Sequence, residues 1–527
     1  MAPHPYLASN QLACKLKTID DFQLDHATST PPTSLEEGIE QLEADDVEEP
    51  STPPPISSDL SLEEARSAAL AGNLDLQVQI VNPEIAFAAT NEELARFEST
   101  FLGTFSSNRS DLPPGFFAGG GPDNTVDRTA GGFDIPLLSG GSLLLEQEFQ
   151  RNNPHVDVLD STQDAATGLQ FRQPLLRGAG VRVNTAPIHV TVARAGIAGS
   201  RTKLTAINVL ADLERAYWDL FAARRLLEIR GEQVRIAEQL LQNTLRRIEL
   251  NAIPATQTPK AERLRAESGL RQRRAARVVA ETNVRLAERE LKRIMLRPDL
   301  PVDGLTAIVP TTAPEPVGLE LDREHLSQCA VENRMEILEL QLQLFIEDLN
   351  IEVENNARLP RVDMGFDYHT RGFGTKFDEA WDSMLDGQFG DHLFLLTVEV
   401  PLAGNLGARS RLRQAQLRRF QTKLATQRAT VAIRKEVNDA VDRIDRDWRR
   451  ILENRLATQA TAETFQAERA VHLAGRITAT QLLDAAANLA AAQEAEILSL
   501  ADYQISKVEL AVATGTVLGF GQVQWNP

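Results

Sequence analysis

One very long helical segment constrains the fold of this chain more than any other feature. Between Pro187 and Leu250, apolar residues recur every three or four positions, charged residues fill the gaps, and no second proline occurs. Pro187 suits the first turn of a helix, where its missing N–H has no partner to lose. At about 1.5 Å per residue, such a helix would be about 95 Å long, far longer than a small domain is wide.

This helix is predicted to form one arm of a hairpin, and the hairpin occurs twice. After a break at Asn251–Pro254 the chain returns through Ala255–Met295, and a second long run, Ala408–Leu473, breaks at 474–478 and returns through Ala479–Thr514. Ala216, Asn251 and Gln257 lie 224 positions (440 − 216) before Ala440, Gly475 and Gln481. A constant offset across a whole hairpin indicates an internal duplication.

A shorter helix is expected ahead of each hairpin. Ser61 and Glu64 have the spacing of a capping box, which opens a helix that we expect to run to about Phe97. Its counterpart is expected over Asp322–Ala357. At 1.5 Å per residue, the first helix and the return helix stacked end to end slightly exceed the length of the long helix, so both could lie alongside it.

Strands are predicted between the shorter helix and the long helix of each repeat. Arg361–Thr370 and His392–Val400 alternate in polarity, and Phe101–Asn108 and Thr167–Gln173 take the matching places in the first repeat. This pattern fits a half-buried sheet in water or a lipid-facing barrel with a polar lumen. On the alternation alone the water-soluble sheet is favoured, because the barrel signal of a single strand is weak.

The first repeat also contains an insertion, residues 109–166. It holds a further strand-like pair near Gly132–Leu137 and Ser142–Gln150, joined at 139–141. This pair could enlarge the main sheet or pack beside it. The predicted organisation is therefore a disordered, acidic, proline-rich tail (1–58), repeat 1 (59–300), a proline-rich connector (301–320), repeat 2 (321–520) and a C-terminal tail (521–527).

Composition excludes several classes of protein. A net charge of −19 argues against a nucleic-acid binder, which needs clustered basic residues. Two cysteines, Cys14 and Cys329, are too few for a disulfide framework. Neither a transmembrane helix nor a signal peptide is predicted, since no long apolar run occurs. Because no apolar segment precedes Cys14, an ordinary thiol is favoured there over a lipidated one.

We find no pattern of residues that predicts catalysis. The eight histidines are scattered, with no pair at zinc-site spacing, so neither a metal nor a cofactor is expected. Tyr217 and Trp218 are interpreted as packing residues between helices. The run Arg271–Arg277 lies among acidic helical segments and is interpreted as a solvated face. We do not expect an enzyme.

The element order, the duplication and three phrases resemble the TolC-like outer-membrane factors, the outer membrane efflux protein family. The phrases are QPLLRG from Gln173, PLAGNLG from Pro401 and AGRITATQLLDAAANLAAAQEAEILSL from Ala474, and the resemblance covers about Leu60–Phe520. It implies a mainly α fold with β strands, built from two repeats of helix, strand, strand and long hairpin. Three copies would form an outer-membrane β-barrel, four strands per chain, continued by a long periplasmic α-helical barrel.

The resemblance also implies a function and partners. The protein would be a passive efflux or secretion channel, embedded in outer-membrane lipid and opened by a periplasmic membrane-fusion adaptor and an inner-membrane pump of the RND or ABC type. The alternative is a coiled-coil envelope scaffold without a channel. Strands that flank both hairpins argue against the scaffold, which has no reason to duplicate them.

Candidate site residues follow from the same resemblance. The tips that would contact the adaptor contain Asn251, Ala252, Ile253, Pro254, Gly475, Arg476 and Thr478. Family members often carry two acids just after the second tip, which narrow the pore; here Gln481 and Asp484 stand in those places, so one acid is missing. Asp484 could equally be a plain solvated charge. Asp363 and Asp367 are candidates for the barrel lumen, where they would favour cations.

Overall fold

The long helices dominate the computed structural model, which describes residues 57–110, 124–154, 161–250, 258–402, 404–474 and 476–520. The chain divides into two units, and the larger one contains the described residues of 58–304 and 308–520. Residues 1–56 of the predicted disordered tail (1–58), the predicted C-terminal tail (521–527) and the tip residues Asn251–Pro254 and Gly475 lie outside the described residues. Ser57 and Ser58 lie in a short strand, so the prediction of disorder was wrong for these two residues.

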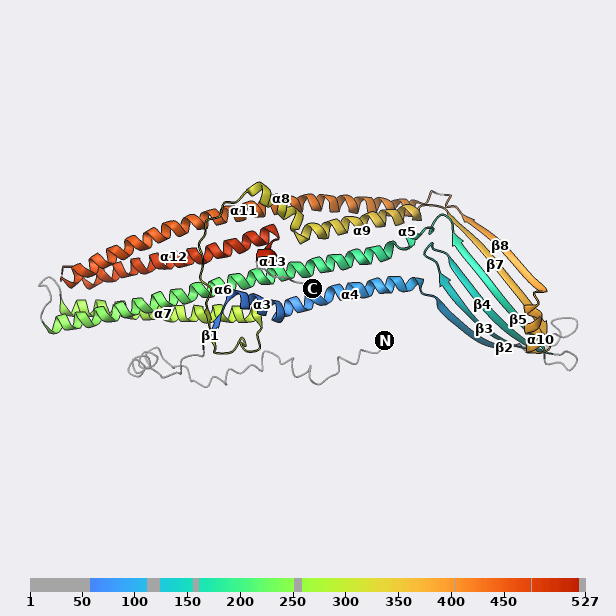
Figure 1. The fold of residues 1–527 in the computed structure, drawn as a ribbon, viewed down its shortest axis with the longest axis horizontal. Coiled ribbons are helices and arrows are strands. Elements are labelled where there is room, and N and C mark those ends of the chain that lie inside the picture. Colours follow the sequence, from blue (N-terminus) through green and yellow to red (C-terminus); the bar gives the residue numbers. More distant parts are fainter. Residues whose placement is uncertain are drawn as a thin grey trace. The chain divides into compact units, whose positions relative to one another are not determined.

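Two long hairpins are present, as predicted. Helices α6 (Ala186–Glu249) and α7 (Pro259–Met295) form the first, and α11 (Leu406–Leu473) and α12 (Ala479–Thr514) form the second (Figure 1). None of the described helices is long and apolar enough to cross a membrane. The short elements outside the main sheet include β1 (Ser57–Leu60), η3 (Ala95–Phe97), α5 (Val181–Asn184), β6 (Ala307–Pro310), α10 (Phe377–Leu385) and α13 (Val517–Phe520).

The middle of α6 holds the largest core cluster. Tyr217 and Trp218 are buried there against α3 (Leu62–Gly72) and α7, which confirms their predicted packing role. The Tyr217 hydroxyl donates to the carbonyl oxygen of Leu60 (3.1 Å) and accepts from the backbone N–H of Thr312 (3.0 Å). The hydroxyl of this buried ring therefore links α6 to the chain segments at Leu60 and Thr312.

Each predicted shorter helix is divided in two. The first consists of α3 (Leu62–Gly72) and α4 (Leu74–Leu94), and the second of α8 (Arg323–Asn333) and α9 (Met335–Ala357). The capping box at the start of α3 is confirmed. The prediction of continuous helices was wrong, because Asn73 adopts an extended conformation and its Oδ1 caps α4 by accepting from the Leu76 N–H.

Each break lies where a return helix ends. The amide of Asn73 donates to the carbonyl oxygen of Ile294 in the last turn of α7 (3.1 Å). In the second repeat, the guanidinium of Arg334 donates to the carbonyl oxygen of Val512 in the last turn of α12 (3.3 Å). In each repeat, the shorter helices thus meet the return helix end to end alongside the long helix, as the helix lengths predicted.

The helices form four adjacent columns within this unit. Next to the sheet the order is α4, α6, α9, α11, and towards the hairpin tips it is α7, α6, α12, α11 (Figure 1). Helices α4 and α7 lie along one border of this layer, and α11 lies along the other.

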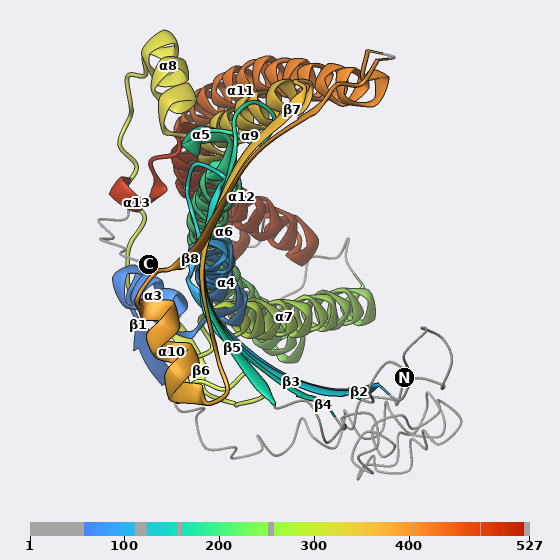
Figure 2. The same cartoon turned by 90° about the vertical axis from the view of Figure 1, so that its right-hand side faces the viewer.

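The described strands other than β1 and β6 form one antiparallel sheet of six, in the order β2-β3-β4-β5-β7-β8. Their bounds are Thr100–Ser110, Asn124–Pro136, Ser142–Pro154, Thr162–Pro174, Arg361–Gly374 and Phe389–Glu399. The sheet curves as it crosses the end of the helical layer (Figure 2). The inserted pair, β3 and β4, lies inside the sheet, so the chain supplies six strands there rather than the four that the resemblance implies.

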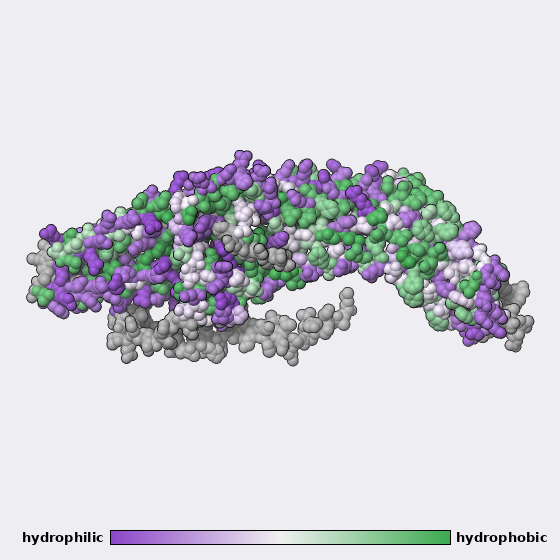
Figure 3. Space-filling view, in the orientation of Figure 1, coloured by the Kyte–Doolittle hydropathy of each residue, from purple (hydrophilic) through white to green (hydrophobic). Residues whose placement is uncertain are grey.

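The two faces of the sheet differ in chemistry. Phe101, Phe133, Leu145, Leu169 and Tyr368 follow one another across the register on one face. On the view shown in Figure 3, hydrophobic side chains gather on the half of the sheet next to the helices and hydrophilic ones at its far end. Helix α10 packs on the apolar face at that far end, against Phe149 and Ala165.

Candidate functional site

The beginning of α12 holds three of the predicted tip and gate residues. Thr478 is the N-cap: its hydroxyl accepts from the N–H of Gln481 (3.3 Å), and its own N–H donates to the side chain of Gln481 (3.0 Å). The side chain of Gln481 is therefore engaged in a capping box at the helix terminus. This bond fixes the first turn of α12 directly after the tip, and Arg476 lies exposed just before it.

Asp484 lies one turn further along α12, exposed to solvent. It borders two grooves, one of about 710 Å³ between α12 and the α6–α7 hairpin, and one of about 380 Å³ between α12 and α11. Gln481 borders the second groove as well. The two gate candidates are thus brought together on the surface of α12 beside the tip.

The larger groove is crossed by polar contacts that join the two hairpins. Arg273 on α7 donates from Nη2 to the carbonyl oxygen of Leu483 (3.1 Å), and Gln233 on α6 donates to that of Ala486 (3.0 Å). Arg230 on α6 forms an ion pair with Glu494 (2.7 Å). These contacts tie the first part of α12 to the other hairpin at three successive levels.

Close backbone approach allows the contact at Arg273. A Cβ atom at Gly269 would lie 2.7 Å from Cδ1 of Leu483, so a side chain at residue 269 would require this leucine to shift. Burial lowers the pKa of Arg273, the nearby Arg230 lowers it further, and the charge of Asp484 partly raises it again. The interpretation of Arg271–Arg277 as a solvated face was therefore wrong for Arg273, and Gly269, one turn earlier, was the available signal.

His472, in the last turn of α11, is buried at the same end of the hairpins. Its Nδ1–H donates to the carbonyl oxygen of Ile477, 3.2 Å away, across the tip. Burial lowers the pKa of His472, and the charge of Arg247 on α6 also lowers it. The hydrogen bond to Ile477 and the charge of Glu262 on α7 act in the opposite direction. Sequence reasoning passed over this histidine because no neighbour in the chain marks it.

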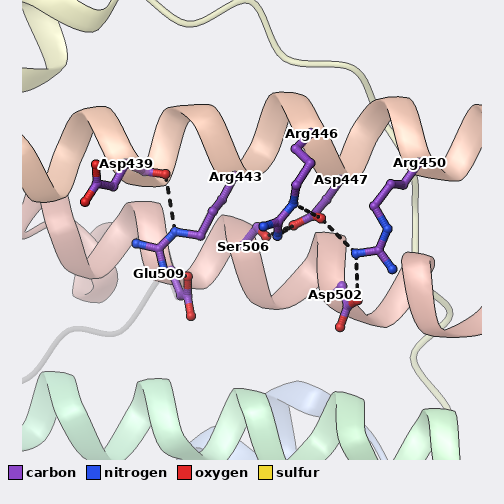
Figure 4. A network of polar contacts seen from close by, with 8 residues as sticks. All are labelled: Asp439, Arg443, Arg446, Asp447, Arg450, Asp502, Ser506 and Glu509. Carbon is purple, nitrogen blue, oxygen red and sulfur yellow. Dashed lines mark hydrogen bonds and ion pairs between the residues drawn. The ribbon is translucent and has the colours of Figure 1, made fainter.

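The second hairpin is held together by a carboxylate inside a cluster of arginines (Figure 4). Asp447 on α11 is fully buried and accepts hydrogen bonds from Arg446 (2.9 Å) and Arg450 (3.2 Å) of its own helix. The hydroxyl of Ser506 on α12 also donates to it, and Arg450 reaches Asp502 on α12 (3.1 Å). The α11–α12 contact is thus polar as well as apolar.

Asp363 and Asp367 lie on the sheet face opposite the apolar one, as their alternation predicted. Asp367 is 8% exposed and forms a two-bond ion pair with Arg172 on β5, with Nη2 to Oδ2 at 2.9 Å. Asp363 pairs with Arg361. Both carboxylates are therefore paired with arginines, which the sequence pattern did not predict.

Other charged residues share this face. A further ion pair, between Arg128 and Glu148, belongs to the inserted pair of strands, and Arg371 pairs with Asp391. The face is polar and carries more acids than bases: Arg128, Asp134, Glu146, Glu148, Asp164, Arg172, Arg361, Asp363, Asp367, Arg371, Asp391 and Glu399. Nothing in the arrangement resembles a catalytic centre, and no group of three or more potential metal ligands occurs among the described residues.

The chain is similar to known proteins in part of its sequence and in its fold. Residues 326–516 match the model of the family described as "Outer membrane efflux protein". No curated protein matches the chain in sequence. Several solved structures match it in fold, at low sequence identity.

A structure of CusC, described in terms of transmembrane channel formation, is 16% identical, with a TM-score of 0.62 over 88% of this chain and 93% of that one. The outer membrane protein VceC of Vibrio cholerae is 13% identical, with a TM-score of 0.61 over 86% and 96%. The open state of the MtrE outer membrane channel of Neisseria gonorrhoeae is 17% identical, with a TM-score of 0.59 over 87% and 89%.

These matches confirm the predicted resemblance to the TolC-like outer-membrane factors. The family match agrees with the predicted efflux function and outer-membrane location, and it does not favour the scaffold alternative. The proteins that the chain resembles are channels rather than enzymes.

Proposed function

We propose that this protein is the outer-membrane channel of a tripartite export system, because residues 326–516 match the model of the outer membrane efflux protein family. Three copies form a closed barrel from their sheets and a tunnel from their hairpins, and a periplasmic adaptor and an inner-membrane pump open the tunnel at the tips. The observation that carries this proposal is a sheet with one apolar and one polar face, placed at the end of long hairpins.

The edges of the sheet support closure by further copies. Among the described residues, β2 pairs only with β3 and β8 pairs only with β7, so each has an unpaired edge. In lipid, unpaired backbone groups are too costly to persist, so the edges must meet. Since β2 leads away from α4 and β8 leads back to α11, β8 of one copy and β2 of the next can pair in an antiparallel sense.

The borders of the helical layer support the same contact between copies. Apolar residues at helical spacing lie exposed along α4, and a similar row lies exposed along α11. The rows consist of Leu74 (59% exposed), Val78 (65%), Val81 (52%) and Ile85 (61%), and of Leu417 (49%), Phe420 (58%), Leu424 (48%) and Val431 (69%). A second copy is the partner that fits, because α4 adjoins β2 and α11 adjoins β8, so one head-to-tail contact covers both rows and both edges.

The gated step is assigned to the tips. The contacts from Arg230, Gln233 and Arg273 hold α12 against the other hairpin next to the tip. Binding of an adaptor at the tips, including Arg476 and Thr478, would open the passage by favouring a state in which α7 and α12 separate. Gln481 and Asp484 lie on the helix that would move.

Membrane fractionation and mass measurement in mild detergent test the proposal. We expect the full chain, exported with a suitable signal, in the outer-membrane fraction as a trimer. Phe420→Glu, which places a charge in the exposed row of α11, is expected to dissociate the trimer, whereas Leu319→Glu in the connector, similarly exposed at 47%, is the matched control. A soluble monomer or dimer of the parent chain would overturn the channel and leave the scaffold.

A further inference from the structure

We propose that the inserted hairpin, β3 and β4, forms part of the barrel wall, so that three copies close a barrel of eighteen strands. The number follows from six strands per chain. This inference rests on the proposed trimer, and it replaces the four strands per chain that the family resemblance implies. It assigns to residues 124–154 a direct role in setting the width of the channel.

Hydrogen bonding makes the hairpin an integral part of the sheet. Every residue from Thr100 to Ser110 on β2 is paired with β3, and β4 is paired with β5 from Ser142 to Asn152. Strand β2 has no contact with β5 in the order of the sheet. A wall of four strands per chain would need both of these pairings broken and β2 paired with β5 in their place.

Two apolar rows of the outward face continue across the hairpin. On β3 and β4, Phe133 and Leu145 stand in register between Phe101 on β2 and Leu169 on β5. The next row repeats the pattern, with Ile135 and Leu143 ahead of Phe171. A hairpin that packed beside the barrel would have no reason to carry lipid-compatible residues at the same height as its neighbours.

The inward face continues in the same way. Arg128 on β3 pairs with Glu148 on β4, and Arg172 on β5 pairs with Asp367 on β7, all on the polar face. Glu146 adds an acid between these pairs. Charged residues on the polar face of β5 and β7 are thus matched by charged residues on the same face of β3 and β4.

The width of the helical layer fits six strands better than four. Four helix columns spaced about 9 Å apart would occupy about 36 Å of the circumference of a ring. Six strands about 4.8 Å apart, tilted by about 40°, would occupy about 38 Å, whereas four would occupy about 25 Å. With six strands the barrel continues the tunnel at nearly the same width, and with four it would narrow.

The consequence concerns which cargo can pass. The diameter of a barrel grows roughly linearly with its number of strands. A barrel of eighteen strands would not be the narrowest part of the conduit, so selection by size would fall to the tips. The inserted hairpin would thereby suit the channel to cargo as wide as its helical tunnel admits.

Cysteine labelling of the assembled protein in lipid vesicles tests this inference. In a chain with Cys14 and Cys329 replaced by serine, Leu145→Cys and Glu146→Cys probe the two faces of β4. Tyr368→Cys and His369→Cys on β7 are the matched controls, since Leu145 and Tyr368 are 42% and 43% exposed and share one row. A lipid-soluble maleimide and a charged, water-soluble maleimide are compared, and labelling is measured only on the trimer.

We expect the same alternation on both strands, with positions 145 and 368 labelled from lipid and positions 146 and 369 from water. If the charged reagent labels both 145 and 146 while β7 still alternates, the hairpin lies outside the wall and the inference fails, although the channel stands. If neither strand alternates, the barrel itself fails. Electron microscopy of the trimer in nanodiscs gives an independent count, eighteen strands if the inference holds and twelve if it does not.

Discussion

Arg273 on α7 donates a hydrogen bond from Nη2 to the backbone carbonyl oxygen of Leu483 on α12, 3.1 Å away. Because the acceptor belongs to the backbone, the contact fixes the position of α12 itself rather than that of one side chain. Both residues lie close to the tips, where the proposed gate must open.

Removal of this contact is expected to loosen the closed tip. Arg273→Gln shortens the side chain, and a half-buried hydrogen bond from a charged group contributes about 1 to 2 kcal/mol. We expect the variant trimer to show larger and more frequent openings in planar-bilayer recordings without adaptor. Arg277→Gln, which removes only an exposed pair with Glu281 on the same helix, is the control. Equal currents in both variants would remove Arg273 from the gate.

The ion preference of the proposed barrel depends on paired carboxylates. Asp367→Asn leaves the guanidinium of Arg172 on the polar face without its counter-charge, and Asp363→Asn does the same for Arg361. We expect each variant to shift the reversal potential in a KCl gradient towards lower cation preference, with the larger shift for the more buried Asp367. Tyr368→Phe on the opposite face is the control. An unchanged reversal potential would show that these carboxylates do not line the pore.

The α11–α12 pairing is expected to weaken when its buried carboxylate is removed. Asp447→Ala leaves the Ser506 hydroxyl and the Arg446 guanidinium without this acceptor, and Arg450 keeps only its contact with Asp502, at a cost of about 2 kcal/mol. Asp445→Ala, which breaks only an exposed pair with Arg449, should change the unfolding free energy by less than about 0.5 kcal/mol. Denaturant unfolding monitored by circular dichroism compares the two variants, and equal stabilities would contradict the role assigned to Asp447.

This cluster also predicts an acid dependence. Burial raises the pKa of Asp447, but hydrogen bonds from Arg446 and Ser506 and the charges of Arg446 and Arg450 lower it more, so it lies below its ordinary value of 3.8. A carboxyl group whose folded-state pKa is lowered stabilises the fold fully above the unfolded pKa and loses that effect as the pH falls through the folded one. The stability difference between the parent chain and Asp447→Ala should therefore shrink only below about pH 4.

The tip at His472 is expected to loosen in mild acid. Because burial lowers its pKa below 6.5, the closed tip favours neutral imidazole, and an opened tip takes up the proton first. Stability of the closed tip is thus complete above pH 6.5 and falls as the pH drops towards the folded pKa. Arg247 opposes protonation and Glu262 favours it, but burial outweighs both.

Hydrogen exchange of residues 473–478 at pH 7.5 and pH 5.5, corrected for intrinsic rates, measures this effect. The parent chain should gain exchange at the lower pH. His472→Gln, whose amide can still donate to Ile477 but does not titrate, should exchange equally at both. The same gain in the variant would place the acid response elsewhere.

The long helices were predictable because their periodicity persists over more than sixty residues, and local exceptions average out over such a length. The breaks at Asn73 and Arg334 were not, because each depends on a partner distant in sequence, the carbonyl oxygens of Ile294 and Val512. The alternation of polar and apolar residues predicted the strands. Register between strands is a tertiary property, so the position of β3 and β4 in the sheet could not be predicted.

The same limit applies to the candidate site. The polar face of Asp363 and Asp367 followed from alternation, whereas their arginine partners did not: Arg172 lies on another strand, and Arg361, two residues before Asp363, was not recognised as its partner. Arg273 was placed on a solvated face because charge composition indicates solvent exposure on average and says nothing about a single contact across hairpins. Gln481 remains a predicted gate residue, and its side chain forms a capping box with Thr478 that the sequence analysis did not predict.

Among the described residues, only the first repeat carries an inserted hairpin, β3–β4, and this makes the two halves of the chain unequal. In the helical layer the halves correspond, α4 with α9 and α6 with α11, so a ring of three chains would look nearly sixfold from the tips. In the sheet the first half gives four strands and the second gives two, so the same ring is strictly threefold at its other end. The near-sixfold symmetry of the helical layer is thus absent from the barrel, where the two duplicated halves of the chain differ most.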